Sequence, residues 1–348
     1  MKIFYCGARY NYYDPKKGSS FEHENFYLSL KAMPGIEVVY FPFERILEAG
    51  KRKYNDELLA AVMSEKPDIL FAFMLSDEFI PGVLDQIKKH TTSIAWFADD
   101  SWRFYDYSRV WAKHFTWVVT TYSWMPALYK KIGQPNVIRS QWAADTAIYH
   151  PVGPRGGADA PGVSFVGGWT KPRAKIVARL MKAGIPLEVY GGGWERGRVS
   201  NEEMIRIFGA SKINLGLNPA PGFLNKNSLG RLAFRRSRER IVPDLHIFRN
   251  LQTLLHRNIP QIKARHFEIP ACGGFVMTSM ADDLGSFYEI DKEVVIYEGV
   301  DDCAEKVRYY LDHPSEREAI ARAGYERTIR DHTYAKRFEK IFKEAGFS

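Results

Sequence analysis

Short apolar runs alternate with polar, helix-like stretches along most of this chain. In the first half, the apolar runs are residues 2–6, 38–41, 69–73, 93–97, 117–120 and 137–139, and the helix-like stretches between them are 21–33, 55–64, 82–90 and 123–132. A second alternation has apolar runs at 163–166, 187–190, 213–217, 274–278 and 294–297. This pattern is typical of a parallel sheet flanked by crossover helices. We therefore predict an α/β protein with two parallel sheets.

A segment rich in glycine and proline, residues 151–161, separates the two alternations and has no periodicity. Such composition is typical of a linker between domains. With 348 residues, of which 45% are hydrophobic, the chain exceeds the size at which single cores usually stop growing. We expect one domain over residues 1–152, to which a C-terminal helix in 334–348 returns, and a second over residues 153–333.

Composition restricts the class of protein. No apolar run approaches the roughly 20 residues of a membrane span. The start, Met1 to Cys6, reads as a short strand followed by a polar loop, and not as a signal peptide. The three cysteines, Cys6, Cys272 and Cys303, form an odd number without metal-ligand spacing, which suits reduced thiols. We expect a cytoplasmic protein.

The net charge of +8 comes from one part of the chain, residues 221–265. Its Lys and Arg residues are Lys226, Arg231, Arg235, Arg236, Arg238, Arg240, Arg249, Arg257, Lys263 and Arg265, against Glu239 and Asp244. Such a patch can bind a diphosphate, an acidic glycan, a nucleic acid or an anionic membrane, the last through residues 226–240 as a peripheral contact at the inner membrane face. A solvated helix face explains residues 235–240 equally well. The sequence contains no nucleic-acid-binding motif, which disfavours that partner.

One carboxylate stands among cations before a glycine pair in the stretch 263–279. Glu268 can accept both hydroxyls of a ribose, and Lys263 and Arg265 can face phosphate oxygens. Gly273 and Gly274 let backbone approach a ligand where a side chain would intrude. The alternative is that Glu268 is only a solvated charge on a short helix before a glycine cap.

The string Phe267-Glu-Ile-Pro-Ala-Cys-Gly-Gly274 resembles the donor site of group 1 glycosyltransferases of the GT-B fold, in particular their CgeB-like, spore-maturation branch. Further similar segments are 163–168, 211–218, 309–314, 323–327 and 332–338, so that the resemblance covers about residues 90–345. It implies two Rossmann-like domains whose parallel sheets face across a cleft. It also implies that the second domain binds a nucleotide sugar and that the last helix, about 334–344, crosses back to the first domain.

A glycine turn followed by cations is the candidate phosphate site. Gly167 and Gly168 end an apolar run and precede a helix-like stretch, whose first backbone amides favour an anion. In the resembled family, the Arg and Lys after this turn bind the diphosphate, which implies that role for Arg173 and Lys175. At the next run, Tyr190 and Gly191 could contact the base; an ordinary glycine-rich loop is the alternative.

Asp99 and Asp100 directly follow the apolar run 93–97. Open α/β sheets bind ligands at the carboxyl ends of their strands, and like-charge repulsion between the two can raise one pKa toward neutrality. We interpret this pair as the catalytic base for an acceptor hydroxyl; the alternative is a helix cap. Retaining relatives carry a second Glu where this chain has Pro260, so the stereochemical outcome stays open. Cations and helix amides can neutralise a diphosphate, and we expect no metal requirement.

The hypothesis is a glycosyltransferase that transfers a hexosyl or related sugar (EC 2.4 class). Its donor would be a UDP-sugar, with GDP- and dTDP-sugars as alternatives. Its acceptor would be a hydroxyl of a glycan, a lipid-linked glycan, a protein or a small molecule. Two other functions stay open. One is a nucleotide-sugar epimerase or hydrolase of the same fold, and the other is a non-enzymatic protein that binds nucleic acid or a membrane surface through its basic segment.

Overall fold

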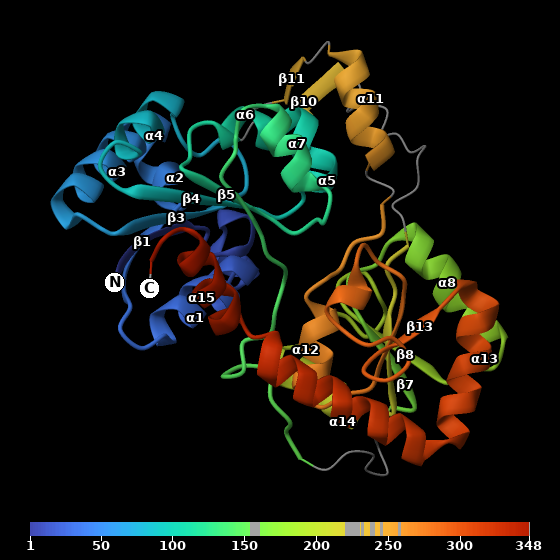
Figure 1. Ribbon diagram of the computed structural model, residues 1–348. Coiled ribbons are helices and arrows are strands. Elements are labelled where there is room, and N and C mark those ends of the chain that lie inside the picture. Colours follow the sequence, from blue (N-terminus) through green and yellow to red (C-terminus); the bar gives the residue numbers. More distant parts are fainter. Residues whose placement is uncertain are drawn as a thin grey trace. The chain divides into compact units, whose positions relative to one another are not determined.

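The computed structural model describes residues 1–153, 161–219, 230, 233–236, 241–243, 246–256 and 259–347. These residues form two compact units (Figure 1). The first unit consists of residues 1–141, the described part of 223–258, and residues from Arg337 on. The second unit consists of the described residues within 142–222 and 259–336. Each contains one parallel sheet with helices, which confirms the predicted α/β class.

The units differ from the sequence-based division at residue 152 in two segments. Residues from Trp142 on pack with the second unit, where the amide of Ala144 donates to the carbonyl of His332 over 3.0 Å and Tyr149 is buried. The described part of 223–258 packs with the first unit. Both results depend on contacts between residues far apart in the chain, which local composition does not encode. Residues 154–160 of the expected linker lie outside the described residues.

The first unit contains a six-stranded parallel sheet with the order β2-β1-β3-β4-β5-β6. Its strands are β1 (Lys2–Gly7), β2 (Glu37–Pro42), β3 (Ile69–Met74), β4 (Thr92–Phe97), β5 (Trp117–Thr120) and β6 (Val137–Arg139). Each coincides with a predicted run within two residues. The helical segments are η1 (Asn11–Tyr13), η2 (Pro15–Lys17), η3 (His23–Tyr27), α1 (Leu28–Ala32), α2 (Arg45–Ala49), α3 (Lys51–Glu65), α4 (Pro81–Ile87), α5 (Asp100–Arg103), η4 (Phe104–Ser108), α6 (Arg109–Ala112), α7 (Met125–Lys131), α11 (Ile247–His256) and α15 (Tyr334–Glu344).

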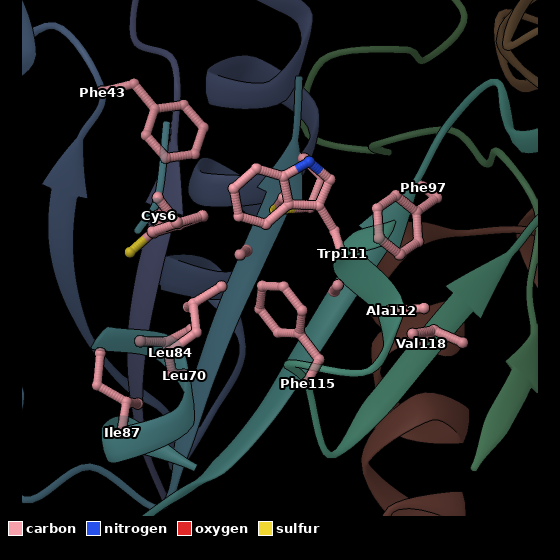
Figure 2. Close-up of a cluster of buried hydrophobic side chains, with 14 of the residues drawn as sticks. Cys6, Phe43, Leu70, Leu84, Ile87, Phe97, Trp111, Ala112, Phe115 and Val118 are labelled. Carbon is pink, nitrogen blue, oxygen red and sulfur yellow. The ribbon is translucent and has the colours of Figure 1, made fainter. Parts of the chain in front are cut away.

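Alternate side chains of these strands enter two cores, because successive residues of a strand point to opposite faces of the sheet. Figure 2 shows the core on one face, where Cys6, Leu70 and Val118 lie near Leu84 of α4 and Phe115. On the other face, strand and helix aromatics pack edge to face: the ring of Phe71 lies 5.8 Å from Phe338 of α15, and that of Trp96 lies 4.9 Å from Phe26. Burial of each such ring contributes about 1.5–3 kcal/mol.

The second unit contains a five-stranded parallel sheet with the order β13-β12-β9-β7-β8. Its strands are β7 (Val163–Val166), β8 (Leu187–Tyr190), β9 (Ile213–Gly216), β12 (Val276–Ser279) and β13 (Val295–Tyr297), and its helices are α8 (Lys171–Lys182), α9 (Asn201–Ala210), α12 (Arg265–Ala271), η5 (Leu284–Ser286), α13 (Gly299–Asp312) and α14 (Pro314–Asp331). The chain passes from β7 to β8 on one side and then returns to β9 on the other. Ligands of open α/β sheets bind at such a reversal of strand order.

Between β9 and α12, the described residues include a small antiparallel pair, β10 (Phe234–Arg236) and β11 (Ile241–Pro243). Of the basic segment 226–240, only residues 230 and 233–236 are described, so the rest of the expected membrane contact lies outside the described residues. Within the described ranges, no helix combines the length and the apolar character needed to cross a bilayer. The three cysteines are buried and free.

Candidate functional site

The two glycine turns of the second unit lie side by side at the carboxyl ends of β7 and β8. The amide of Gly167 donates to the carbonyl of Tyr190 over 2.9 Å. Gly191 has a φ of +128°, and a Cβ at this residue would lie 2.3 Å from the carbonyl oxygen of Gly167. Only a glycine permits this approach. Gly168, by contrast, is exposed, and a Cβ there would meet nothing within 4 Å.

Arg173 is held at this turn by three contacts. Its amide donates to Oγ1 of Thr170, which caps α8, over 3.3 Å. Its Nη1 donates to the carbonyl of Gly168 over 2.8 Å, and its Nε donates to the carbonyl of Leu217, just after β9, over 3.0 Å. The guanidinium therefore lies at the reversal of strand order between β7 and β9. Lys175, two residues later, is exposed, and the helix turns it about 200° away from Arg173.

A second cation lies close to Arg173. Burial lowers the pKa of Arg173, and the positive charge of Arg265 lowers it further. The guanidinium groups of Arg173 in α8 and Arg265 in α12 therefore lie within electrostatic reach of each other. Like charges at short range repel each other, and an anion bound near both would relieve this repulsion.

Glu268 lies beside Arg265, and it is not a solvated charge. Its side chain is fully buried, and Oε2 accepts a hydrogen bond from Nη1 of Arg265. Oε1 is buried and has no hydrogen-bond partner among the described residues. Tyr149 lies nearby, since burial, and then the charge of Glu268, raise its pKa. Buried carboxylate oxygens are normally hydrogen-bonded, so Oε1 is an acceptor available to a ligand hydroxyl.

A buried histidine network supports this cluster and was missed in the sequence. Nδ1 of His266 lies 3.0 Å from the amide of Lys263, and its Nε2 lies 3.0 Å from Oγ1 of Thr278. The amide of Asn218 lies 3.3 Å from the same Nε2. Burial lowers the pKa of His266 to about 4. The neutral ring therefore ties the start of α12 to the ends of β9 and β12. A histidine within an apolar helical stretch is the one signal that could have indicated it.

The other residues of the second unit that the sequence analysis places at the nucleotide have contacts within the protein. The ammonium group of Lys263 donates to the side chain of Gln261. A Cβ at Gly274 would lie 2.4 Å from the carbonyl of Phe208, so this glycine allows close packing against α9. Gly273, with a φ of +74°, ends the turn after α12. The hydroxyl of Tyr190 donates to Glu188 over 2.7 Å, and only 8% of Tyr190 is exposed.

An exposed aromatic side chain beside the candidate phosphate turn, Gly167 and Gly168, was not singled out in the sequence. Trp169 directly follows Gly168 and is 49% exposed. Its amide donates to the carbonyl of Gly192 over 2.9 Å, which joins the two glycine turns a second time. The indole of Trp194 donates to the carbonyl of Gly167 over 2.8 Å and is partly buried. Trp169, and not Tyr190, therefore presents an accessible ring here.

The aspartate pair of the first unit is divided by burial. Asp99 precedes α5 and is partly exposed, and its side chain makes no capping hydrogen bond. Asp100 is fully buried, and its Oδ2 accepts from the hydroxyl of Tyr129 over 3.0 Å. Burial raises the pKa of Asp100 to about 7, with a smaller contribution from the charge of Asp99. Of the two, only Asp99 can meet an acceptor hydroxyl in this conformation.

In the described part of the chain, no three His, Cys, Asp or Glu side chains lie close enough together to hold a metal ion. The groups that do gather suit a different ligand. Arg173 and Arg265 are cations, Glu268 offers a buried acceptor, and Gly168 leaves open space. A phosphate and a vicinal diol fit these groups.

Comparison with known proteins agrees with this chemistry. Residues 173–343 match the glycosyl transferase-like family. A segment of 89 residues is 32% identical to spore protein CgeB of Bacillus subtilis (strain 168) and covers 26% of this chain and 26% of that protein. The matched family segment contains Glu268, Arg265 and Arg173.

Solved structures extend the comparison to the whole chain. Sucrose-phosphate synthase from Thermosynechococcus elongatus has a TM-score of 0.63 at 12% identity, with 99% of this chain and 97% of that chain covered. HepE of Anabaena, in complex with UDP and glucose, has a TM-score of 0.57 at 9% identity, with 99% of both chains covered. The expected GT-B fold is thereby confirmed. The family match and the fold together support a glycosyltransferase.

Proposed function

We propose that this protein transfers a sugar from a nucleoside diphosphate sugar to an acceptor hydroxyl. The observation that carries the proposal is that two guanidinium groups within electrostatic reach of each other accompany one buried, half-paired carboxylate in the second unit. Arg173 and Arg265 supply the charge that a diphosphate needs, and Glu268 supplies the acceptor for a ribose hydroxyl. The family match over residues 173–343 supports this assignment.

The donor half of the reaction follows from these groups. As the bond between the sugar and the diphosphate breaks, negative charge develops on the leaving phosphate. Arg173 is fixed by its bonds to the carbonyls of Gly168 and Leu217, so it can stabilise that charge without first reorganising. Gly168 lets phosphate oxygens approach the backbone. Trp169 offers an exposed ring beside them.

The acceptor half is assigned to the first unit. Asp99, at the carboxyl end of β4, would take the proton of the acceptor hydroxyl as its oxygen bonds to the sugar carbon. Asp100 is a positioning residue in this proposal, because it is buried and bound to Tyr129. The hydrogen bond between Asp100 and Tyr129 fixes the first residue of α5, and thereby the backbone of Asp99, which directly precedes that helix.

We further propose a UDP-sugar donor, a hexosyl or related sugar, and membership of the CgeB-like branch. The complex of HepE with UDP and glucose supports the nucleotide, and the 32% identity to CgeB over 89 residues supports the branch. GDP- and dTDP-sugars are the competing donors in the test.

The test measures nucleotide release from UDP-, GDP- and dTDP-sugars, with and without a mixture of oligosaccharide and alkyl glycoside acceptors. We expect release from one donor that depends on acceptor, together with a product heavier than the acceptor by one sugar. Equal release without acceptor would identify a hydrolase, and a changed donor sugar without release would identify an epimerase. Either result would overturn the proposal, as would the absence of binding to every nucleotide.

A further inference from the structure

The loop after β1, residues 10–19, contains two consecutive tyrosines in the left-handed region of the backbone. Tyr12 has a φ of +57° and a ψ of +25°, and Tyr13 has a φ of +61°. Bulky residues rarely adopt this conformation, because their Cβ atom crowds the backbone. Such strain occurs at ligand-binding sites and persists only where the surrounding structure imposes it. The conformation of both tyrosines therefore depends on contacts elsewhere in the first unit.

Hydrogen bonds close this loop at its base. The side-chain amide of Asn11 donates to the carbonyl of Ser19 over 2.6 Å. Oε1 of Glu44, which precedes α2, accepts from the amides of Arg9 and Tyr10 over 2.7 and 2.8 Å. The loop is thus ordered before any ligand arrives, and binding would not have to order it.

The two tyrosines differ in what their side chains contact. The hydroxyl of Tyr13 donates to Oε1 of Glu78, a fully buried residue after β3, over 2.6 Å. Tyr12 is 78% exposed, and the ammonium group of Lys17 lies 4.7 Å from the centre of its ring. A cation–π contact at an exposed site stabilises a fold only weakly. The contact of Tyr13 accounts for its strain, whereas Tyr12 holds an aromatic ring in solvent at little benefit to the fold.

Hydrogen bonds connect this loop with the helix that follows Asp99. Strands β1, β3 and β4 are neighbours in the sheet and parallel, so their carboxyl ends lie at one edge. Oε2 of Glu78 accepts from the amide of Ser76 over 2.9 Å, and the carbonyl of Ser76 accepts from the hydroxyl of Tyr107. Tyr107 belongs to η4, which continues from α5, the helix that Asp99 precedes. The loop and the candidate base thus belong to one network at one edge of the sheet.

We propose that Tyr12 and Lys17 form a subsite for a sugar ring of a carbohydrate acceptor. A sugar ring carries C–H groups on its face, which pack on an aromatic ring, and hydroxyls on its rim, which accept hydrogen bonds from an ammonium group. The subsite rests on the proposed function, since Asp99 at the same edge is the group proposed to act on the acceptor hydroxyl. It narrows the acceptor from any hydroxyl compound to one that contains a sugar ring.

Saturation-transfer difference NMR, without nucleotide, tests the subsite. The probes are maltotriose, cellotriose and chitotriose, with glycerol as a hydroxyl compound that has no sugar ring. We expect signals from the ring protons of at least one trisaccharide and none from glycerol. Tyr12→Asn should abolish these signals, and Tyr12→Phe, which keeps the aromatic face, should retain them. The matched control is Tyr309→Asn, which removes a 45% exposed tyrosine from α13 and should leave the signals unchanged.

Urea unfolding establishes that Tyr12→Asn is folded. Asparagine tolerates a positive φ better than tyrosine does, so the variant should unfold at the same urea concentration as the wild type or at a higher one. Signals that persist in the folded Tyr12→Asn protein would overturn the subsite, and so would a wild type that gives no signal with any of the three trisaccharides.

Calorimetry with UDP on the same proteins separates the subsite from the proposed function. A Tyr12→Asn protein that loses the trisaccharide signals and keeps its UDP affinity supports both. UDP binding by a wild type without any trisaccharide signal would overturn the subsite alone. Trisaccharide signals that depend on Tyr12, in a wild type that binds no nucleotide, would overturn the transferase and leave a carbohydrate-binding site.

Discussion

Arg265 and Glu268 form an ion pair within α12, in which the side chain of Glu268 is fully buried and that of Arg265 is 35% exposed. Burial alone would lower the pKa of Arg265, but the charge of Glu268 raises this pKa above its ordinary value. The pair orients Glu268 through one oxygen and leaves the other oxygen unpaired. Two residues three positions apart therefore supply both a cation and a directed acceptor within a single turn of helix.

The first prediction concerns Arg173. Arg173→Ala should weaken UDP binding by about 10- to 100-fold, because charge-assisted hydrogen bonds to a phosphate are lost. Isothermal titration calorimetry measures the affinity. Arg179→Ala is the control on the same helix, since Arg179 is 60% exposed and pairs at the surface with Asp301 over 3.0 Å. Equal affinities of the two variants would remove Arg173 from the phosphate site.

A second prediction separates two neighbouring glycines. Gly191→Ala should destabilise the second unit by about 2 kcal/mol or more, because the residue has a φ of +128° and its Cβ would press on the carbonyl of Gly167. Gly168→Ala should keep its stability within about 0.5 kcal/mol, since its Cβ meets open space. Urea unfolding measures both.

The same Gly168→Ala variant should nevertheless lose UDP affinity, because its methyl group would occupy the space assigned to phosphate. Normal stability combined with normal UDP affinity would place the phosphate elsewhere.

The third prediction is a pH dependence caused by Asp100. Its pKa rises from the ordinary 3.8 to about 7 through burial, so the folded protein keeps a proton that the unfolded chain has released. The free energy of unfolding should therefore fall as pH rises from about 4 to about 7, at about 1.4 kcal/mol per pH unit at most.

Asp100→Asn removes this dependence. The free energy of unfolding of the variant is subtracted from that of the wild type at each pH, so that the contributions of other groups, such as His266, cancel. The difference should change by on the order of 4 kcal/mol between those limits and stay constant above them. A difference independent of pH would show that Asp100 titrates normally.

The fourth prediction assigns the base. Asp99→Asn should lower the rate of sugar transfer by about 10²- to 10⁴-fold and leave UDP affinity unchanged, because the residue would act on the acceptor only. Asp85→Asn is the control in the same unit, where Asp85 pairs with His114 at the surface of α4. Transfer at the wild-type rate in Asp99→Asn would exclude it as the base.

Much of the fold could be predicted because its strands are continuous apolar runs. Strands buried on both faces, such as β3, leave that signal directly in the sequence. The turn at Gly167 and the pairing of Arg265 with Glu268 are also local, since residues three apart on a helix are neighbours. These features need no knowledge of the sheet order.

The rest of the site depends on the order of the strands. Arg173 meets the carbonyl of Leu217 because β7 and β9 are adjacent, and its sequence separation of 44 residues gives no hint of that contact. For the same reason, the sequence could not show which of the two aspartates is buried. The buried position of Asp100 depends on its contact with Tyr129, which belongs to α7. Gly274 shows the converse, because the sequence predicts a close approach to a ligand, whereas the close approach in the structure is to the carbonyl of Phe208.

The central claim is that Glu268 binds the ribose of a nucleoside diphosphate, and a double-mutant cycle between protein and ligand tests it most directly. Calorimetry would compare UDP with 2′,3′-dideoxyuridine diphosphate on the wild type and on Glu268→Gln, with thermal unfolding to verify the fold. The wild type should prefer UDP by about 10- to 100-fold, and the variant should bind both ligands equally weakly. A folded Glu268→Gln protein that keeps the preference for UDP would contradict the account.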